Sequence, residues 1–131
     1  MRKRKAEPRR PRPTNAELAI LTVLWRRGPS TVREVHQALR EPVGYTTVLK
    51  LLQIMTEKGL VTRDVRTRTH VYRAAVSEAT TKGHLVSDLI DRAFGGSSTA
   101  LVLQALSTTP ASRDELEQIR RLLDQHKGDQ R

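Results

Sequence analysis

Residues 44–73 read GYTTVLKLLQIMTEKGLVTRDVRTRTHVYR, and this stretch predicts a short helix followed by a basic β-hairpin. At about 100° per residue, one stripe of the helix is apolar and consists of Val48, Leu51, Leu52 and Met55. The opposite stripe is polar and consists of Thr46, Lys50 and Gln53. Gly59 ends the helix, because a glycine just past the last turn adopts the left-handed conformation at little cost.

Two β-prone runs follow the predicted helix, at residues 60–65 and 70–74. The four residues between them place Arg66 and Arg68 at the tip of a hairpin. A compact helix with a polar outer face, followed by a hairpin with arginines at its tip, is typical of a winged helix-turn-helix.

Two further helices are predicted before this stretch, and each begins with a capping box that satisfies backbone donors of the first turn. The first spans residues 15–27, its capping box is Thr14 with Glu17, and its core stripe is Leu18, Leu21, Leu24 and Trp25. The second spans residues 32–40, and its capping box is Thr31 with Glu34. Helix, helix, turn, helix and hairpin in this order predict a winged-helix DNA-binding domain over residues 14–75.

Residues 76–131 predict a separate helical domain with helices at about 77–94, 98–107 and from 112 onward. These helices carry too few large side chains to close a core alone, so we expect a symmetric dimer. The expected dimer contacts are Leu85, Leu89, Ile90, Leu101, Leu103, Leu106, Leu116, Ile119, Leu122 and Leu123. The predicted fold class is mainly α with a small β-hairpin: a winged helix-turn-helix followed by a helical dimerisation domain.

The net charge of +10 is unevenly distributed over the 131 residues. Residues 1–13 carry +6, residues 14–75 carry +5 and residues 76–131 carry −1. Charge alone is compatible with nucleic acid, a ribosomal role or a membrane surface as the partner. The Pro/Arg-rich residues 1–13 predict a basic disordered tail, which is either a solvated extension or an arm on DNA phosphates or in a minor groove.

Several classes of site are absent from the sequence. The chain has no cysteine, which excludes disulfides, zinc knuckles and cysteine nucleophiles. The four histidines lack metal-ligand spacing, and there is no phosphate loop, dinucleotide fingerprint or G-x-S-x-G motif. No apolar run approaches the roughly 20 residues that span a bilayer, and no signal peptide is evident. We therefore expect a cytoplasmic protein that is not an enzyme and has no cofactor, metal or small-molecule ligand.

The polar helix face predicts contacts with double-stranded DNA. The expected DNA-binding residues are Tyr45, Thr46, Thr47, Lys50, Gln53, Arg66 and Arg68. Lys50 suits guanine acceptors or a phosphate, and Gln53 suits adenine or the backbone. Residues at the helix start suit phosphates, and the hairpin arginines suit the backbone or minor groove. The alternative for each residue is a solvated polar surface.

Together these motifs resemble the penicillinase and methicillin-resistance repressor family (BlaI/MecI/CopY-type winged-helix regulators) over about residues 14–127. The family pattern has a Trp near the end of the first helix, T-V-x-E-V in the second and Y-T-T-V opening the recognition helix. K-G-L-V then closes that helix, and the hairpin ends in Tyr. The corresponding residues here are Trp25, Thr31 to Val35, Tyr45 to Val48, Lys58 to Val61, and Tyr72.

The resemblance implies a homodimeric transcriptional repressor that binds palindromic operators through its winged helices and dimerises through its C-terminal helices. It also implies release by a membrane-bound sensor protease that cuts the C-terminal domain after an L-V-L run. The matching bond joins Gln104 and Ala105, where the family typically has Asn–Phe. Copper-responsive members bind the metal through C-terminal cysteines, and this chain has none.

Two other functions remain compatible with the residues. One is a non-specific nucleic-acid-binding accessory protein driven by the basic tail, which would bind random DNA as well as any operator. The other is a winged-helix module whose third helix docks a partner protein, and which would show little salt-dependent affinity for DNA.

Overall fold

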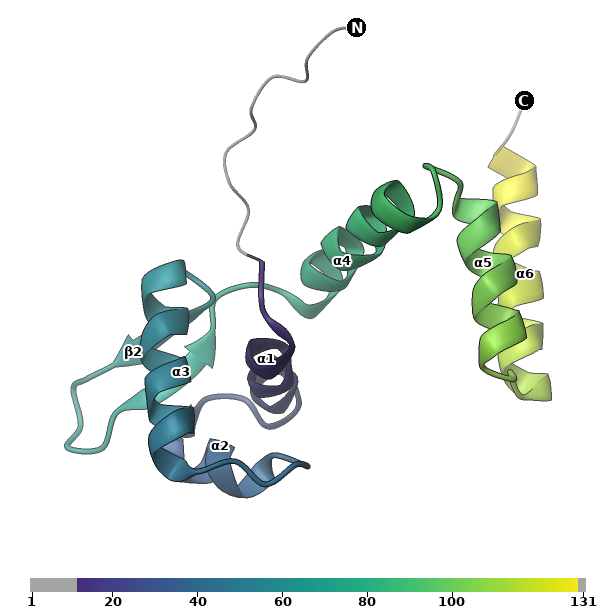
Figure 1. Cartoon of the computed structure of the whole chain (residues 1–131). Helices are drawn as coiled ribbons and strands as arrows, with labels where there is room; N and C mark the ends of the chain where they lie inside the picture. The colour runs from purple at the N-terminus through teal and green to yellow at the C-terminus, as the bar shows by residue number, and fades with distance from the viewer. Residues whose placement is uncertain (1–11, 130–131) are drawn as a thin grey trace, which may run out of the picture. The chain divides into compact units, whose positions relative to one another are not determined.

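The computed structural model describes residues 12–129, which contain six helices and a small antiparallel sheet (Figure 1). Their order is α1 (Asn15–Arg27), β1 (Ser30–Thr31), α2 (Val32–Ala38), α3 (Tyr45–Lys58), β2 (Val61–Asp64), β3 (Val71–Ala74), α4 (Glu78–Ala93), α5 (Ser98–Thr108) and α6 (Arg113–Asp129). The predicted fold class, mainly α with a β-hairpin in a winged helix-turn-helix, is confirmed. Most of the predicted basic tail, residues 1–11, lies outside the described residues.

The chain forms two compact units, the first ending at Gly83 and the second beginning at His84. The division falls inside α4, whereas the predicted domains meet between residues 75 and 76. Contacts with the first unit account for the difference. Trp25 Nε1 donates a 3.0 Å hydrogen bond to the Val76 carbonyl, and the side chain of Thr81 is buried. The DNA-binding and dimerisation roles of the two units stay predictions.

Local capping explains why the helix starts could be read from the sequence. At α1, Glu17 N–H donates to Thr14 Oγ1 at 3.2 Å, and Thr14 N–H donates to Glu17 Oε1 at 2.9 Å. The same reciprocal bonds open α2 through Thr31 with Glu34, and α6 through Ser112 with Glu115. Each box satisfies two of the backbone donors that a helix start leaves without a partner inside the helix.

The second helix is shorter than predicted and ends at Ala38 rather than Arg40. The backbone becomes extended at Leu39, with φ −68° and ψ 137°, and the chain then turns into α3. His36 supports this turn, because its Nε2 lies 2.7 Å from the Val43 carbonyl oxygen. The side chain of one short helix therefore holds the connection to the next.

The sheet has the order β1-β3-β2 with both pairings antiparallel. Strand β1 was not predicted, since two residues are too few to give an alternating pattern, and it pairs Ser30 with Tyr72. The β2–β3 hairpin, residues 61–74, is called the wing below. Its register pairs Arg63 with Tyr72 and Asp64 with Val71, so Arg63 and Asp64 lie on opposite faces.

The core of the first unit lies between α1, α2, α3 and the sheet. Its buried apolar residues are Ile20, Leu21, Leu24, Val32, Val35, Val48, Leu52, Met55, Leu60, Val61 and Tyr72. On α1, Ile20 occupies the core, whereas Leu18 and Trp25 of the predicted stripe are only half-buried. On α3, Leu51 is likewise half-buried. The apolar stripe of α3 thus faces inward, and its polar stripe faces solvent.

Contacts from Gly59 and Lys58 hold the C-terminal end of α3 in place. At its C-terminal end, Gly59 takes the left-handed conformation, with φ +82°, and its N–H bonds to the carbonyls of Met55 and Thr56. Lys58 Nζ donates to Glu17 Oε1 at 2.6 Å and to the Arg12 carbonyl at 3.1 Å. This contact ties the last turn of α3 to the first turn of α1.

The Glu17 side chain is only 3% exposed, so its ionisation depends on its partners. Burial raises the pKa of Glu17, but hydrogen bonds from Lys58 and Thr14 together outweigh burial and leave the pKa below its usual value. Ionised Glu17 therefore stabilises the folded state above the ordinary carboxyl pKa, and that contribution is lost as the pH falls through the lowered pKa.

The second unit has no buried core within one chain. No side chain from Lys82 to Lys127 is buried. Its exposed large apolar side chains are Val86, Leu89, Val102, Leu103, Leu106, Leu116, Leu122 and Leu123. Local caps support the helix starts. Ser97 Oγ accepts a hydrogen bond from Ala100 N–H at the start of α5, and the Ser112 capping box opens α6.

Replacing Lys58 with Ala should lower the free energy of unfolding by about 1–3 kcal/mol at neutral pH, because Glu17 would remain buried as a carboxylate without its cation. The difference from wild type should shrink as urea unfolding is repeated from neutral pH down to about pH 3. Lys82→Ala is the matched control. It breaks the exposed 2.6 Å pair with Glu78 and should cost less than about 0.5 kcal/mol. A Lys58→Ala protein as stable as wild type at neutral pH would contradict the role assigned to this contact.

Candidate nucleic-acid interface

The exposed side of α3 carries every residue of this helix that the sequence predicts to contact DNA. Those residues are Tyr45, Thr46, Thr47, Lys50 and Gln53, and all of them are exposed. The buried stripe of Val48, Leu52 and Met55 lies on the other side. A helix in this setting can enter a major groove without giving up any core contact.

Tyr45 and Thr47 both belong to the first turn of α3 but lie on different sides of the helix. Tyr45 borders a hollow between α3 and the wing, whereas Thr47 borders a hollow between α3 and α1. His36 packs edge-on against Tyr45 with ring centroids 5.8 Å apart and an interplanar angle of 78°. Since His36 also holds the Val43 carbonyl, it positions both the turn and the first side chain of α3. In the sequence, the only indication of this role is that His36 lies one turn after Val32.

A hollow beside the wing brings residues of α2, α3 and the wing together. It measures about 520 Å³ and is lined by Thr31, Val32, Arg33, Tyr45, Leu49, Arg68, Thr69, His70 and Tyr72. Arg33 comes from α2 and Arg68 from the tip of the wing, so the two arginines line the hollow from different elements. Within residues 12–129 neither arginine has an ion pair, which leaves both available to an anion.

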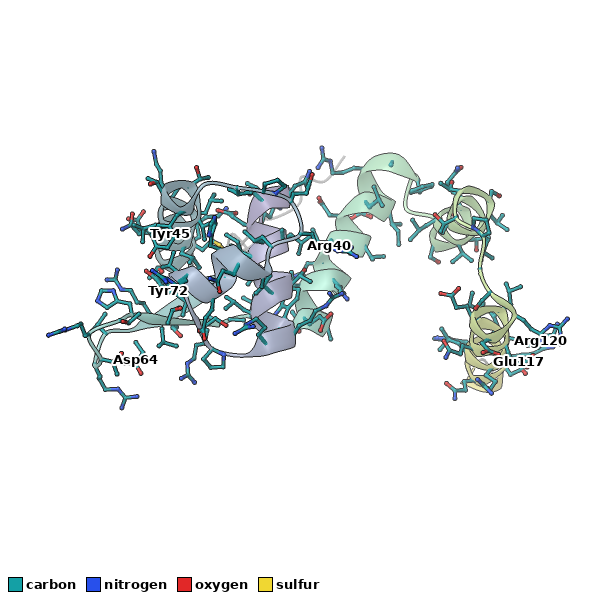
Figure 2. All side chains as sticks on the ribbon, turned by 90° about the horizontal axis from the view of Figure 1, so that it is seen from below. Arg40, Tyr45, Asp64, Tyr72, Glu117 and Arg120 are labelled. Atoms are coloured by element: carbon teal, nitrogen blue, oxygen red, sulfur yellow. The ribbon has the colours of Figure 1, made fainter. Side chains whose placement is uncertain are left out.

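Arg66 and Arg68 are both predicted to contact DNA, but their surroundings in the structure differ. Arg68 lines the hollow beside α3, whereas Arg66 is bound to Asp64, with Nη2 2.8 Å from Oδ2. Figure 2 labels Asp64 and Tyr72 on the wing, and Tyr45 on the neighbouring α3. The sign that could have revealed the pair is an Asp two residues before an Arg in a turn, where an Asp side chain commonly bonds to nearby backbone.

Two further arginines of the wing follow the strand register. Arg63 lies opposite Tyr72 and shares its face of the sheet, although its own side chain is exposed. Arg73 lies opposite Thr62, on the same face as Asp64, and its charge contributes to lowering the Asp64 pKa. Positive charge is therefore present on both faces of the wing.

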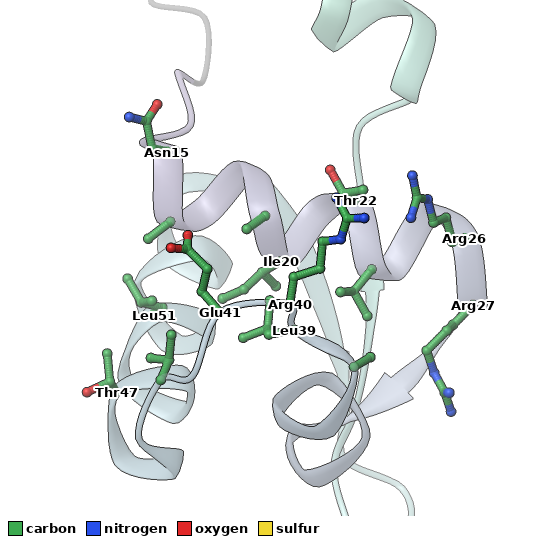
Figure 3. A pocket seen from close by; sticks show the side chains of 15 residues that line it. Asn15, Ile20, Thr22, Arg26, Arg27, Leu39, Arg40, Glu41, Thr47 and Leu51 are labelled. Atoms are coloured by element: carbon green, nitrogen blue, oxygen red, sulfur yellow. The ribbon is translucent and has the colours of Figure 1, made fainter.

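A second hollow, of about 750 Å³, lies between α1, the turn at residues 38–43 and α3 (Figure 3). Its lining is mainly apolar and includes Ile20, Leu39 and Leu51. Arg40 and Glu41 extend from the turn toward α1 (Figure 3). Arg40 therefore lies on the α1 side of α3, away from the hollow that Arg33 and Arg68 share.

The second unit contains the other residues named from the sequence. Of the expected dimer contacts, Leu85, Ile90, Leu101 and Ile119 are half-buried, and Leu89, Leu103, Leu106, Leu116, Leu122 and Leu123 are exposed. Gln104 and Ala105, which flank the implied cleavage bond, are exposed on α5. Gln104 Nε2 donates a 3.0 Å hydrogen bond to Thr108 Oγ1, so its side chain is occupied within the helix.

Across residues 12–129 no three His, Cys, Asp or Glu side chains are grouped so that they could hold a metal ion. In the same range, no helix combines the length and apolar character that crossing a membrane requires.

Known proteins resemble this chain in sequence and in structure. The family profile described as penicillinase repressor matches residues 13–125. The transcriptional regulator BlaI of Mycobacterium tuberculosis is 34% identical over 111 residues, covering 82% of this chain and 79% of the relative. The penicillinase repressor of Bacillus licheniformis is 24% identical over 123 residues, covering 90% and 94%. A solved CopR repressor structure is 28% identical with a TM-score of 0.41, and the match covers 49% of this chain and 96% of that one.

Replacing Arg68 with Ala should weaken binding to any DNA duplex and reduce the slope of log K against log salt concentration by about 0.9, because one phosphate contact is lost. The measurement is a salt series of fluorescence-anisotropy titrations on a random duplex. Arg120→Ala, which removes the same charge from an exposed position on α6, should leave the slope unchanged. If the Arg68 and Arg120 variants gave equal slopes, the wing hollow would not be a phosphate site.

Proposed function

The chain belongs to the penicillinase repressor family, and on that premise we propose that it is a sequence-specific transcriptional repressor that binds palindromic operators as a homodimer. The observation that carries the proposal is the two-sided character of α3. Its inner stripe is buried in the core, and its outer stripe presents Thr46, Lys50 and Gln53 next to a cationic wing.

In the proposed complex α3 lies in a major groove with its N-terminal end leading. Lys50 and Gln53 face base edges, where they match guanine acceptors and the adenine edge respectively. Arg33 and Arg68 bind the phosphate backbone from the two sides of the wing hollow. Backbone contacts set the register, and the α3 side chains read the sequence.

The homodimer is supported by the second unit. It exposes eight large apolar side chains and has no buried side chain between Lys82 and Lys127. A contiguous apolar surface on a short helical segment commonly marks an interface between subunits, and twofold symmetry is the usual arrangement. A twofold dimer presents two α3 helices to two half-sites, which is why its operator would be palindromic.

Relief of repression by proteolysis is a further part of the proposal. The implied bond between Gln104 and Ala105 lies on exposed α5, and cutting it would detach α6 with its exposed leucines. Each winged helix would then lose the high effective concentration that the other gives it, so operator affinity would fall steeply. The protease would be the membrane-bound sensor that the family resemblance implies.

A second candidate function rests on the charge of residues 1–13, which carry +6. A protein that binds DNA mainly through this segment would be a non-specific accessory protein. Its affinity would be equal for all duplexes, and deleting residues 1–13 would abolish it.

Full-length protein should bind its own upstream DNA at least about 10³-fold more tightly than a random duplex of equal length and salt concentration. Lys50→Ala should cost roughly 1–3 kcal/mol at the base pair that it reads, or weaken binding to all sequences with a flatter salt slope if it contacts phosphate. Lys82→Ala on α4 is the control for loss of a lysine. Equal affinities for the two duplexes would favour the accessory function, and unchanged binding by the Lys50 variant would remove α3 from the interface.

Leu103→Lys should convert a dimer into monomers, because it places a charge in the apolar surface of α5, where Leu103 is 62% exposed. Analytical ultracentrifugation should show the change in mass, and operator affinity should fall by about 10²- to 10⁴-fold as the two sites become independent. Thr109→Lys adds the same charge at an exposed position just past α5 and should leave the mass unchanged. A monomeric wild type at concentrations that saturate the operator would refute the dimer.

A further inference from the structure

We propose that Asp64 limits how strongly the wing binds the DNA backbone, because it competes with phosphate for the guanidinium group of Arg66. This inference rests on the proposed DNA-binding function and adds to it a residue that controls affinity without contacting DNA favourably. Asp64 is the single acidic residue in the wing, among four arginines at positions 63, 66, 68 and 73.

The contact between Asp64 and Arg66 is more extensive than a simple surface ion pair. Arg66 Nη2 donates to Oδ2 at 2.8 Å, and Arg66 Nε donates to Oδ1 at 3.1 Å. These two parallel bonds use the edge of the guanidinium group that would otherwise grip a phosphate with the same geometry. An Arg66 side chain in this state offers a phosphate fewer donors than the side chain of Arg68, which has no partner within residues 12–129.

The carboxylate is held more firmly than the guanidinium group. The backbone N–H of Arg66 donates to Asp64 Oδ1 at 2.9 Å, and Asp64 lies opposite Val71 in the β-ladder. The Asp64 side chain is 24% exposed, whereas the Arg66 side chain is 86% exposed. When DNA approaches, the arginine can rotate toward a phosphate, but the carboxylate stays on the wing.

Asp64 is negatively charged at neutral pH. Hydrogen bonds from the Arg66 side chain and backbone lower the pKa of Asp64 to about 2, and the charge of Arg73 acts in the same direction. Phosphate binding by Arg66 therefore breaks two charge-assisted bonds and leaves a carboxylate near the negative backbone. Both effects act on every DNA sequence equally, because the backbone carries no sequence information.

Asp64→Asn is the sharpest test, since the amide oxygen can still accept the Arg66 N–H and preserve the turn while the charge is removed. Glu78→Gln is the matched control. It removes one negative charge and releases Lys82 from a 2.6 Å ion pair on α4, outside the wing. Arg66→Ala and the double variant Asp64→Asn/Arg66→Ala complete a cycle that separates release of Arg66 from a general change in net charge.

Affinities for a random duplex and for the upstream duplex should be measured for all five proteins across a salt series. Asp64→Asn should bind both duplexes about three- to tenfold more tightly at low salt, with a log–log salt slope steeper by about 0.9. In the Arg66→Ala background the same substitution should give a smaller gain, because it then removes only the repulsion between the Asp64 carboxylate and the DNA backbone. Circular dichroism of each variant establishes that the fold is retained.

Three results would decide the matter. A larger gain with Arg66 present than with Arg66 removed supports competition for this arginine. An equal gain in both backgrounds, or no gain with Asp64→Asn, overturns it while leaving the DNA-binding proposal intact. Failure of the wild-type protein to bind either duplex would instead reject the proposed function itself, so the two failures are distinguishable.

Discussion

Burial of the inner stripe of α3 is the constraint on which the rest of the first unit depends. Val48, Leu52 and Met55 are completely removed from solvent between α1, α2 and the sheet. Because a helix cannot turn one face inward without turning the opposite face outward, this packing determines which side chains can meet a ligand. The ends of α3 are then held by polar contacts, through His36 at its start and Lys58 at its end.

The two units differ in how much of their apolar surface is buried within one chain. The first unit buries eleven apolar residues, including Tyr72, and so has a core of its own. The second unit consists of the end of α4 and the capped helices α5 and α6, and most of its leucines remain exposed. Local capping can form a helix but cannot bury its apolar face, and in most proteins that burial supplies most of the helical stability. The proposed dimer would provide the missing surface.

Charge in the wing is organised by pairing as well as by number. Four arginines would all attract phosphate if they were equally available, yet Asp64 holds Arg66 and lies on the same face as Arg73. Arg68 and Arg33 instead line a hollow with Tyr45 at the start of α3. The strength of the wing as a phosphate-binding element therefore depends on which arginines have partners, and net charge alone does not describe it.

The helices, the hairpin and their order could be predicted from the sequence, because capping boxes, glycine stops and apolar periodicity act within a few residues. Thr14 with Glu17, Thr31 with Glu34 and Gly59 place the helix ends with little help from distant residues. Features that depend on contacts between distant parts of the chain, or on side-chain geometry, became visible only in the folded protein. There Ile20 lies in the core, the two-residue strand β1 pairs with β3, Lys58 binds Glu17, and Arg66 and Arg68 have different surroundings. The periodicity of apolar residues predicts which face of a helix is buried. It does not predict which distant residue a side chain will contact, or which way a flexible arginine side chain will point.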